Sequence, residues 1–143
     1  MKKMLFAMLV VILAMTSCTN ETLGNFSMLP IQSQTMITNC LDKDNISFVL
    51  IEKGLFKTEY EVAFNDASKL EFDKSGMLTK ADFDHSSVPD CLIPEVVLAY
   101  VHTNFPNAYV TEWAKDDGRW NLELNSGLEL VFNSKYQFVS VDD

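Results

Sequence analysis

The last third of the chain alternates between apolar and polar residues, which is the pattern of half-buried β-strands. The segment RWNLEL puts Trp120, Leu122 and Leu124 on one face and Arg119, Asn121 and Glu123 on the other. A tight turn signal, NSG at 125–127, follows this segment. AYVTEWAKD before it, and LELVF and YQFVSV after it, also have strand patterns. Together they predict a four-stranded antiparallel meander.

Two prolines mark the starts of two expected helices. Pro94 opens the segment EVVLAYVHTNF, which has apolar residues at helical spacing: Val97, Leu98, Val101 and Phe105. Pro106 prevents its continuation, so this helix should end near Phe105. Pro30 opens IQSQTMITNCL, a weaker helical pattern whose expected buried face is Ile37, Cys40 and Leu41.

The first half of the chain repeats the order of the second. Apolar positions match at a constant offset of 60 over three strands: Tyr60 and Trp120, Val62 and Leu122, Leu70 and Leu130, Phe72 and Phe132, Leu78 and Phe138. We predict a duplication, with the alternative of two unrelated meanders that align by periodicity alone. The expected fold class is α+β, with two tandem repeats of one helix followed by a four-stranded antiparallel meander. Each repeat is too short to bury an adequate core alone. We therefore expect the repeats to pack together, through their helices or edge to edge.

The N-terminus has the features of an export signal. Lys2 and Lys3 precede a short apolar run, and the small residues TSC end at Cys18. This resembles a bacterial lipoprotein signal, in which the cysteine carries acyl chains; an ordinary signal cut nearby is the alternative. Because Thr19 rather than aspartate follows the cysteine, the resemblance implies an outer-membrane anchor. The expected organisation is a signal peptide at 1–17, a tether at 18–29, repeats at 30–84 and 94–143, and a linker at 85–93.

The second half resembles the PepSY-like family, also described as beta-lactamase-inhibitor-like. The matching features are the proline-led helix, NFPNA before the first strand, the DDG turn and the hairpin NSGLELVF. The first half carries EFDKSG at 71–76, a form of the family's last strand pair, whereas the second half has VFNSKY. These motifs are turn and core residues, so the resemblance implies a fold of helix on sheet. It implies binding or inhibition only by analogy.

Charge and cysteine content bear on the expected partners and on disulfide bonding. The net charge is −9, and removing Lys2 and Lys3 with the signal makes it −11. This acidity argues against nucleic acid and leaves the N-terminal lipid as the expected contact with a membrane. Cys40 and Cys91 are expected to form a disulfide or to remain two buried thiols, because export permits the bond but sequence does not show the separation of their Cα atoms.

The residues that carry enzyme chemistry are sparse. The chain has two histidines, His85 and His102, neither within a metal-ligand or catalytic pattern. It also has no glycine-rich phosphate loop. We therefore expect no catalytic residues, no cofactor and no metal. Carboxylates are abundant on the expected outward faces of strands: Glu59, Glu61, Glu71, Asp73, Glu112, Glu123 and Glu129.

An acidic and aromatic recognition surface is the candidate site. It comprises Tyr109, Thr111 and Trp113, with Glu59, Glu61 and Glu123. Exposed aromatic side chains are typical interface anchors. This choice turns Glu112 inward, however, and the opposite choice places Trp113 in the core.

The expected function is that of a lipid-anchored, non-catalytic binding module with a protein or peptide partner. Capture of carbohydrate on exposed aromatic rings is the alternative. A third possibility, a glycoside hydrolase with paired carboxylates, requires a cleft that a four-stranded meander does not obviously provide.

Overall fold

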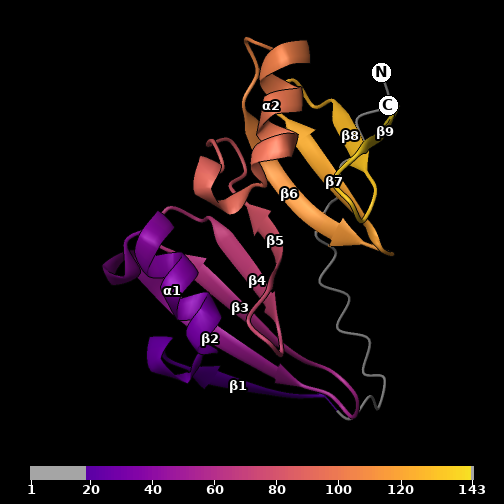
Figure 1. Ribbon diagram of the computed structural model, residues 1–143. Helices are drawn as coiled ribbons and strands as arrows, with labels where there is room; N and C mark the ends of the chain where they lie inside the picture. The colour runs from indigo at the N-terminus through magenta and orange to yellow at the C-terminus, as the bar shows by residue number, and fades with distance from the viewer. Residues whose placement is uncertain (1–18, 143) are drawn as a thin grey trace.

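The computed structural model describes residues 19–142, which form a single antiparallel sheet with two helices (Figure 1). The nine strands of this described chain lie side by side in sequence order. Their bounds are β1 Asn20–Gly24, β2 Ile46–Lys53, β3 Thr58–Phe64, β4 Lys69–Asp73, β5 Leu78–Asp82, β6 Val110–Asp116, β7 Arg119–Leu124, β8 Glu129–Phe132 and β9 Phe138–Asp142.

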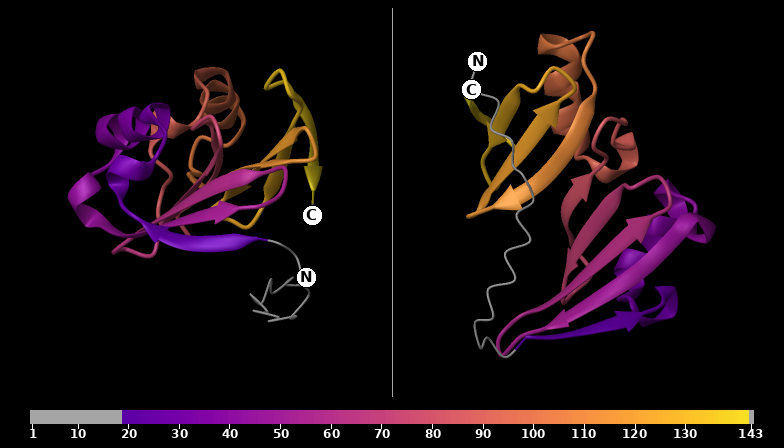
Figure 2. Two further views of the ribbon diagram at one scale, coloured as in Figure 1. Left: turned by 90° about the horizontal axis from the view of Figure 1, so that it is seen from below. Right: turned by 180° about the vertical axis from the view of Figure 1, so that it is seen from behind.

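Both helices lie on the same face of the sheet, as the view from below shows (Figure 2). Helix α1 spans Ile31–Cys40 and α2 spans Glu95–Asn104, and each directly follows the proline that the sequence marked as its start. Three short 3₁₀ helices complete the covering layer: η1 Phe26–Met28, η2 Lys43–Asn45 and η3 Asp90–Leu92. The expected helical positions Ile37, Val97 and Val101 are buried against the sheet.

The core is organised around one row of side chains that crosses the covered face. In this row each residue lies opposite the next in the strand register, from β2 to β8: Val49, Val62, Leu70, Ala81, Trp113, Leu122 and Leu130. Each member is at most 1% exposed. Because side chains alternate between the faces of a strand, their sequence neighbours point to the opposite, open face.

The predicted fold class is wrong. The described chain is mainly β, one sheet of nine strands with two helices, rather than two repeats of a helix and four strands. The strands form one sheet because β5 pairs directly with β6, the edge-to-edge packing that was one of the two expected, through Lys80 opposite Ala114, Ala81 opposite Trp113, and Asp82 opposite Glu112. β1 adds a further strand that was not expected. Residues 83–109, including η3 and α2, cross the covered face and connect these two strands.

The structure places a strand within the predicted tether. Residues Asn20–Gly24 form β1, which pairs along its whole length with β2 and becomes one edge of the sheet. The predicted signal peptide and Cys18 lie outside the described residues. Among the residues that are described, no helix is long and apolar enough to cross a membrane.

Candidate binding surface

The open face of the sheet carries a row of carboxylates on five neighbouring strands. Asp82 lies opposite Glu112, Glu112 opposite Glu123, Glu123 opposite Glu129, and Glu129 opposite Asp142. Adjacent strands are about 4.8 Å apart, so these groups are close neighbours. We call this set the acidic row. Like charges that face one another across strands destabilise a sheet, so the acidic row is not explained by folding stability.

The carboxylates of the acidic row raise the pKa of their neighbours. Partial burial raises the pKa of Glu123, and the charges of Glu112, Glu129 and Asp82 raise it further. Burial likewise raises the pKa of Glu129, with a contribution from Asp142. Solvent therefore screens the repulsion between these carboxylates only in part.

Lys80 is the cation that contacts the acidic row. Its Nζ lies 3.4 Å from an oxygen of Glu112 and 3.8 Å from one of Asp82. Burial acts to lower the pKa of Lys80, but the charges of Glu112, Asp82 and Glu71 outweigh it, and the pKa is raised. The positive charge of Lys80 thus offsets only part of the negative charge of the five carboxylates.

A second group of carboxylates lies toward the opposite end of strands β1 to β4. Glu21 faces Glu52, Glu52 faces Glu59, and Glu59 faces Asp73. Burial raises the pKa of Glu52, as do the charges of Glu21 and Glu59. At this end Lys57 pairs with Glu59 at 2.5 Å.

The predicted acidic residues lie on the open face but are not brought together. Glu59 and Glu61 are on β3, whereas Glu123 is on β7, four strands away. Glu61 pairs with Lys69 at 3.6 Å. The candidate surface therefore missed four members of the acidic row: Asp82, Glu112, Glu129 and Asp142. The alternation of β8 marks Glu129 as an outward residue, whereas that of β6 left the orientation of Glu112 open, and only the strand register aligns the two.

The predicted aromatic surface does not exist. Trp113 is 1% exposed and stacks on Trp120, with ring centroids 4.6 Å apart. Thr111 is also buried, and its hydroxyl donates to the carbonyl of Glu123 at 3.3 Å. The physical reason is that Ala81, opposite Trp113, is small and leaves room in the core row for the indole, while Glu112 points to the open face.

Tyr109 is exposed, but it is held by hydrogen bonds in the loop before β6 and is not stacked with Trp113. It precedes β6, and its hydroxyl donates to the carbonyl of His85 at 3.2 Å. Its backbone N–H donates to the side chain of Asn125 at 2.9 Å. These bonds give Tyr109 a role in fixing the loop before β6.

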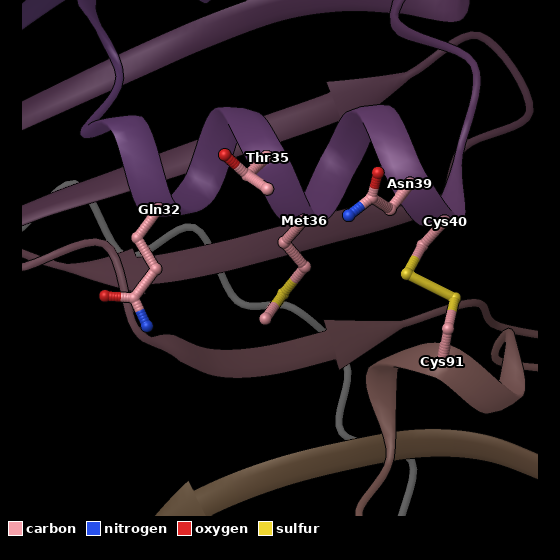
Figure 3. A pocket seen from close by; sticks show the side chains of 6 residues that line it. All are labelled: Gln32, Thr35, Met36, Asn39, Cys40 and Cys91. Atoms are coloured by element: carbon pink, nitrogen blue, oxygen red, sulfur yellow. A yellow bond between two sulfur atoms is a disulfide. The ribbon is translucent and has the colours of Figure 1, made fainter.

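Cys40 and Cys91 form a disulfide that joins the end of α1 to η3 (Figure 3). Their Cα atoms are 5.9 Å apart, within the range that a disulfide spans. The bond lies at an open groove that the sequence did not indicate, lined by Gln32, Thr35, Met36, Asn39 and the two cysteines. Because none of these side chains is an acid or a base, the groove offers no acid–base chemistry.

The histidines are also not arranged for catalysis. The side chain of His85 is 95% exposed, near Asp84 at 3.4 Å, and His102 is exposed on α2. Within residues 19–142, no three histidine, cysteine or acidic side chains are grouped so as to hold a metal ion.

Comparison with known proteins agrees with this fold. Residues 58–140, more than half of the chain, match the family described as "Putative beta-lactamase-inhibitor-like, PepSY-like". The chain belongs to the PepSY-like family. No curated protein matches it.

Two crystal structures of Bacteroides proteins are similar to this PepSY-like chain. One, from Bacteroides vulgatus, is described as a "putative periplasmic protein" of the DUF2874 family; it is 29% identical with a TM-score of 0.80, covering 87% of this chain and 98% of the other. The second, from Bacteroides thetaiotaomicron, is described as a "putative calcium-regulated periplasmic protein". It is also 29% identical, with a TM-score of 0.78, covering 86% of this chain and 97% of the other.

Proposed function

We propose that this protein is a non-catalytic binding module of the bacterial cell envelope, anchored by acyl chains on Cys18 to the outer membrane. Its open sheet face holds a protein or peptide partner that presents a basic segment. The observation that carries this proposal is the acidic row, which faces solvent on the side that neither helix covers.

Charge complementarity supports a basic partner. The like charges of Glu112, Glu123 and Glu129 oppose one another in the free protein, and within residues 19–142 the lysine paired with this group is Lys80, through Glu112. Lysine or arginine side chains of a partner would relieve this repulsion, and complementary fields favour specific and rapid association. The family's inhibitor-like name is not part of the proposal, because nothing in the acidic row indicates a beta-lactamase as the target.

The burial of the aromatic residues removes the support for carbohydrate capture. That alternative depended on an exposed platform of Tyr109 and Trp113, and Trp113 is in the core. An enzyme is also disfavoured as a proposal, because the grouped carboxylates lie on an open sheet face rather than across a cleft.

Site-specific photo-crosslinking in cells tests the binding face. A crosslinking amino acid at Asn121, on the open face of β7, should form an adduct with a discrete protein. The same group at Thr103, exposed on α2, is the matched control and should not form that adduct. Identical adducts from both positions would contradict the proposal.

Binding by the purified partner then tests the role of charge. The variant Glu112→Gln/Glu123→Gln/Glu129→Gln should bind the identified partner at least about tenfold more weakly, with less dependence on salt. Because a similar structure is described as calcium-regulated, calcium chloride is compared with sodium chloride at equal ionic strength. An effect specific to calcium would favour a metal over a basic partner on this face.

The anchor is tested separately. Cys18→Ser should move the protein from the membrane fraction to the soluble fraction, and mass spectrometry of the wild-type N-terminal peptide should show acylation of Cys18. A variant that stays in the membrane pellet at the mass of the uncut chain would indicate a signal anchor instead.

A further inference from the structure

We propose that the β2–β3 hairpin tip, Leu55 and Phe56, inserts into the interface of the lipid bilayer beside the anchored N-terminus. This inference rests on the lipid anchor of the proposed function and adds a second contact between the protein and its membrane. It was not foreseen from the sequence, which indicated contact through the N-terminal lipid only.

The tip is the most exposed apolar feature in the described chain. Phe56 is 93% exposed and Leu55 is 77% exposed. They form a tight turn, closed by a 2.7 Å hydrogen bond from the N–H of Gly54 to the carbonyl of Lys57. Burying a leucine or phenylalanine side chain contributes favourable free energy. Within the described chain this pair remains largely exposed, so that free energy is available to a contact with another molecule.

The other hairpin turns of the described sheet are built mainly of polar residues and glycine; the β4–β5 turn also carries Met77, which is 52% exposed and so less exposed than Leu55 or Phe56. The turn between β6 and β7 is Asp117–Gly118, and that between β7 and β8 contains Asn125, Ser126 and Gly127. Polar residues and glycine are the usual occupants of such turns. The apolar pair at the β2–β3 turn therefore differs from the residues at the other turns of this sheet. This difference indicates that the pair contacts another molecule.

The position of β1 indicates that the molecule contacted by the tip is the lipid bilayer. β1 begins at Asn20, which lies opposite Lys53 at the base of the tip. Thr19 is closer still, since a methyl group added at Gly54 would lie 3.6 Å from its Cγ2. Figure 1 shows the start of β1 beside the β2–β3 turn at the lower end of the sheet. A lipid on Cys18, one residue before Thr19, would hold this tip against the membrane surface.

The acidic row then points away from the bilayer. It lies at the far ends of the strands, at the end of β5 and the start of β6, whereas the tip lies at the end of β2. An anionic membrane surface would repel the acidic row, so this orientation avoids an unfavourable contact and leaves the row accessible.

The tip should bind by apolar insertion rather than by charge. Lys53 and Lys57 flank it, but Lys57 is paired with Glu59, and Glu52 adjoins Lys53. The carboxylates Glu21, Glu52, Glu59 and Asp73 outnumber these two lysines at this end of the sheet. Phosphatidylcholine vesicles should therefore serve at least as well as vesicles that contain phosphatidylglycerol.

The test uses the full lipidated chain in phosphatidylethanolamine and phosphatidylglycerol vesicles. Phe56→Cys is labelled with an environment-sensitive fluorophore, since Cys40 and Cys91 are joined in the disulfide. Ser126→Cys, in an exposed turn at the other end of the strands, is the matched control. Insertion predicts a blue shift and quenching by brominated lipid at position 56 and neither at position 126. Equal, solvent-like signals at both positions would overturn the proposal.

A second arm separates failure of the tip from failure of the anchor. The Cys18→Ser mature chain, given an N-terminal hexahistidine tag, is held on vesicles that contain nickel-chelating lipid, so that β1 lies at the bilayer whether or not cells acylate Cys18. Insertion predicts the same blue shift at position 56 here. Without the tag, Leu55→Ser/Phe56→Ser should weaken vesicle partition by about tenfold or more. Partition that is unchanged in this variant, or that requires anionic lipid, would show that the tip does not insert and would favour a protein contact for it.

Discussion

Lys80 and Glu112 form an ion pair across the junction of β5 and β6, with Nζ 3.4 Å from Oε1. Only three residue pairs are in register at this junction. The ion pair therefore joins the two halves of the sheet on the open face, where the core row joins them on the covered face.

Replacing Lys80 should weaken the junction. We expect Lys80→Met to lower the free energy of unfolding by about 1 kcal/mol, because it removes a half-buried ion pair and leaves Asp82 and Glu112 unopposed. Lys69→Met is the matched control, since Lys69 is equally exposed but contacts Glu61 alone, at 3.6 Å. Urea unfolding measures both, and an equal loss for the two variants would show that the junction has no special dependence on Lys80.

Removing a charge from the acidic row should stabilise the protein. The raised pKa of Glu123 means that the folded state binds more protons than the unfolded chain within the carboxylate range. Stability therefore falls as the pH rises through that range, above about pH 4. We expect Glu123→Gln to gain about 0.5 kcal/mol at neutral pH, with the gain vanishing toward about pH 4 and shrinking in high salt.

Thermal unfolding at several pH values checks this expectation. Glu95→Gln is the control of opposite sign, because Glu95 lies in the first turn of α2, where the helix dipole favours a negative charge, and its loss should cost about 0.5 kcal/mol. A Glu123→Gln variant that is less stable than wild type at neutral pH would contradict the repulsion in the acidic row.

Gly76 should tolerate alanine poorly. It has φ of +89°, and a methyl group there would lie 2.7 Å from Cβ of Pro30 and 2.8 Å from Oγ of Ser33. The same Oγ donates to the carbonyl of Gly76, which ties the start of α1 to the β4–β5 turn. We expect Gly76→Ala to cost about 2 kcal/mol or more, against about 1 kcal/mol for Gly127→Ala.

Gly127 is a suitable control because it has a similar φ, +84°, but no atom within 4 Å of an added methyl group. The difference in the urea midpoints of the two variants isolates the contact with α1 from the cost of a left-handed backbone. Equal midpoints would show that Pro30 and Ser33 move aside freely.

The Cys40–Cys91 disulfide should contribute strongly to stability. It closes a loop across a sequence separation of 51 residues, for which the chain-entropy estimate is about 4 kcal/mol. Cys40→Ser/Cys91→Ser should unfold at a lower urea concentration, and a reductant should shift the wild type but not this variant. A reductant that leaves the wild-type midpoint unchanged would contradict the expectation.

Truncating buried side chains should cost much more stability than truncating a side chain on the open face. Leu122→Ala and Phe132→Ala each remove a fully buried side chain and should cost about 2–5 kcal/mol. Asn121→Ala, one residue from Leu122 on the open face, should stay within about 0.5 kcal/mol. Similar losses of stability for Asn121→Ala and Leu122→Ala in urea would mean that the two faces of β7 contribute equally to stability, and would contradict this expectation.

The sequence by itself determined the local elements and the family. Pro30 and Pro94 set the starts of the two helices, because the ring of proline favours the entry to a helix whatever the chain does elsewhere. The strict alternation of Trp120, Leu122 and Leu124 determined the buried face of β7 for a similarly local reason.

Only the tertiary structure decided how the strands meet. An alternating pattern shows which residues of a strand share a face, but it does not identify the partner strand. The sequence therefore left open how the two halves pack, and the pairing of β5 with β6 joins them into one sheet. The sequence also left two orientations for β6. Trp113 entered the core because an indole buries far more apolar surface than Ala114 would beside a buried Glu112. The register shift between Val110 and Glu112 allows Val110 to be buried as well. The acidic row depends on the same information. Its five carboxylates come from strands that span residues 82 to 142, and they become neighbours only through the register of the folded sheet.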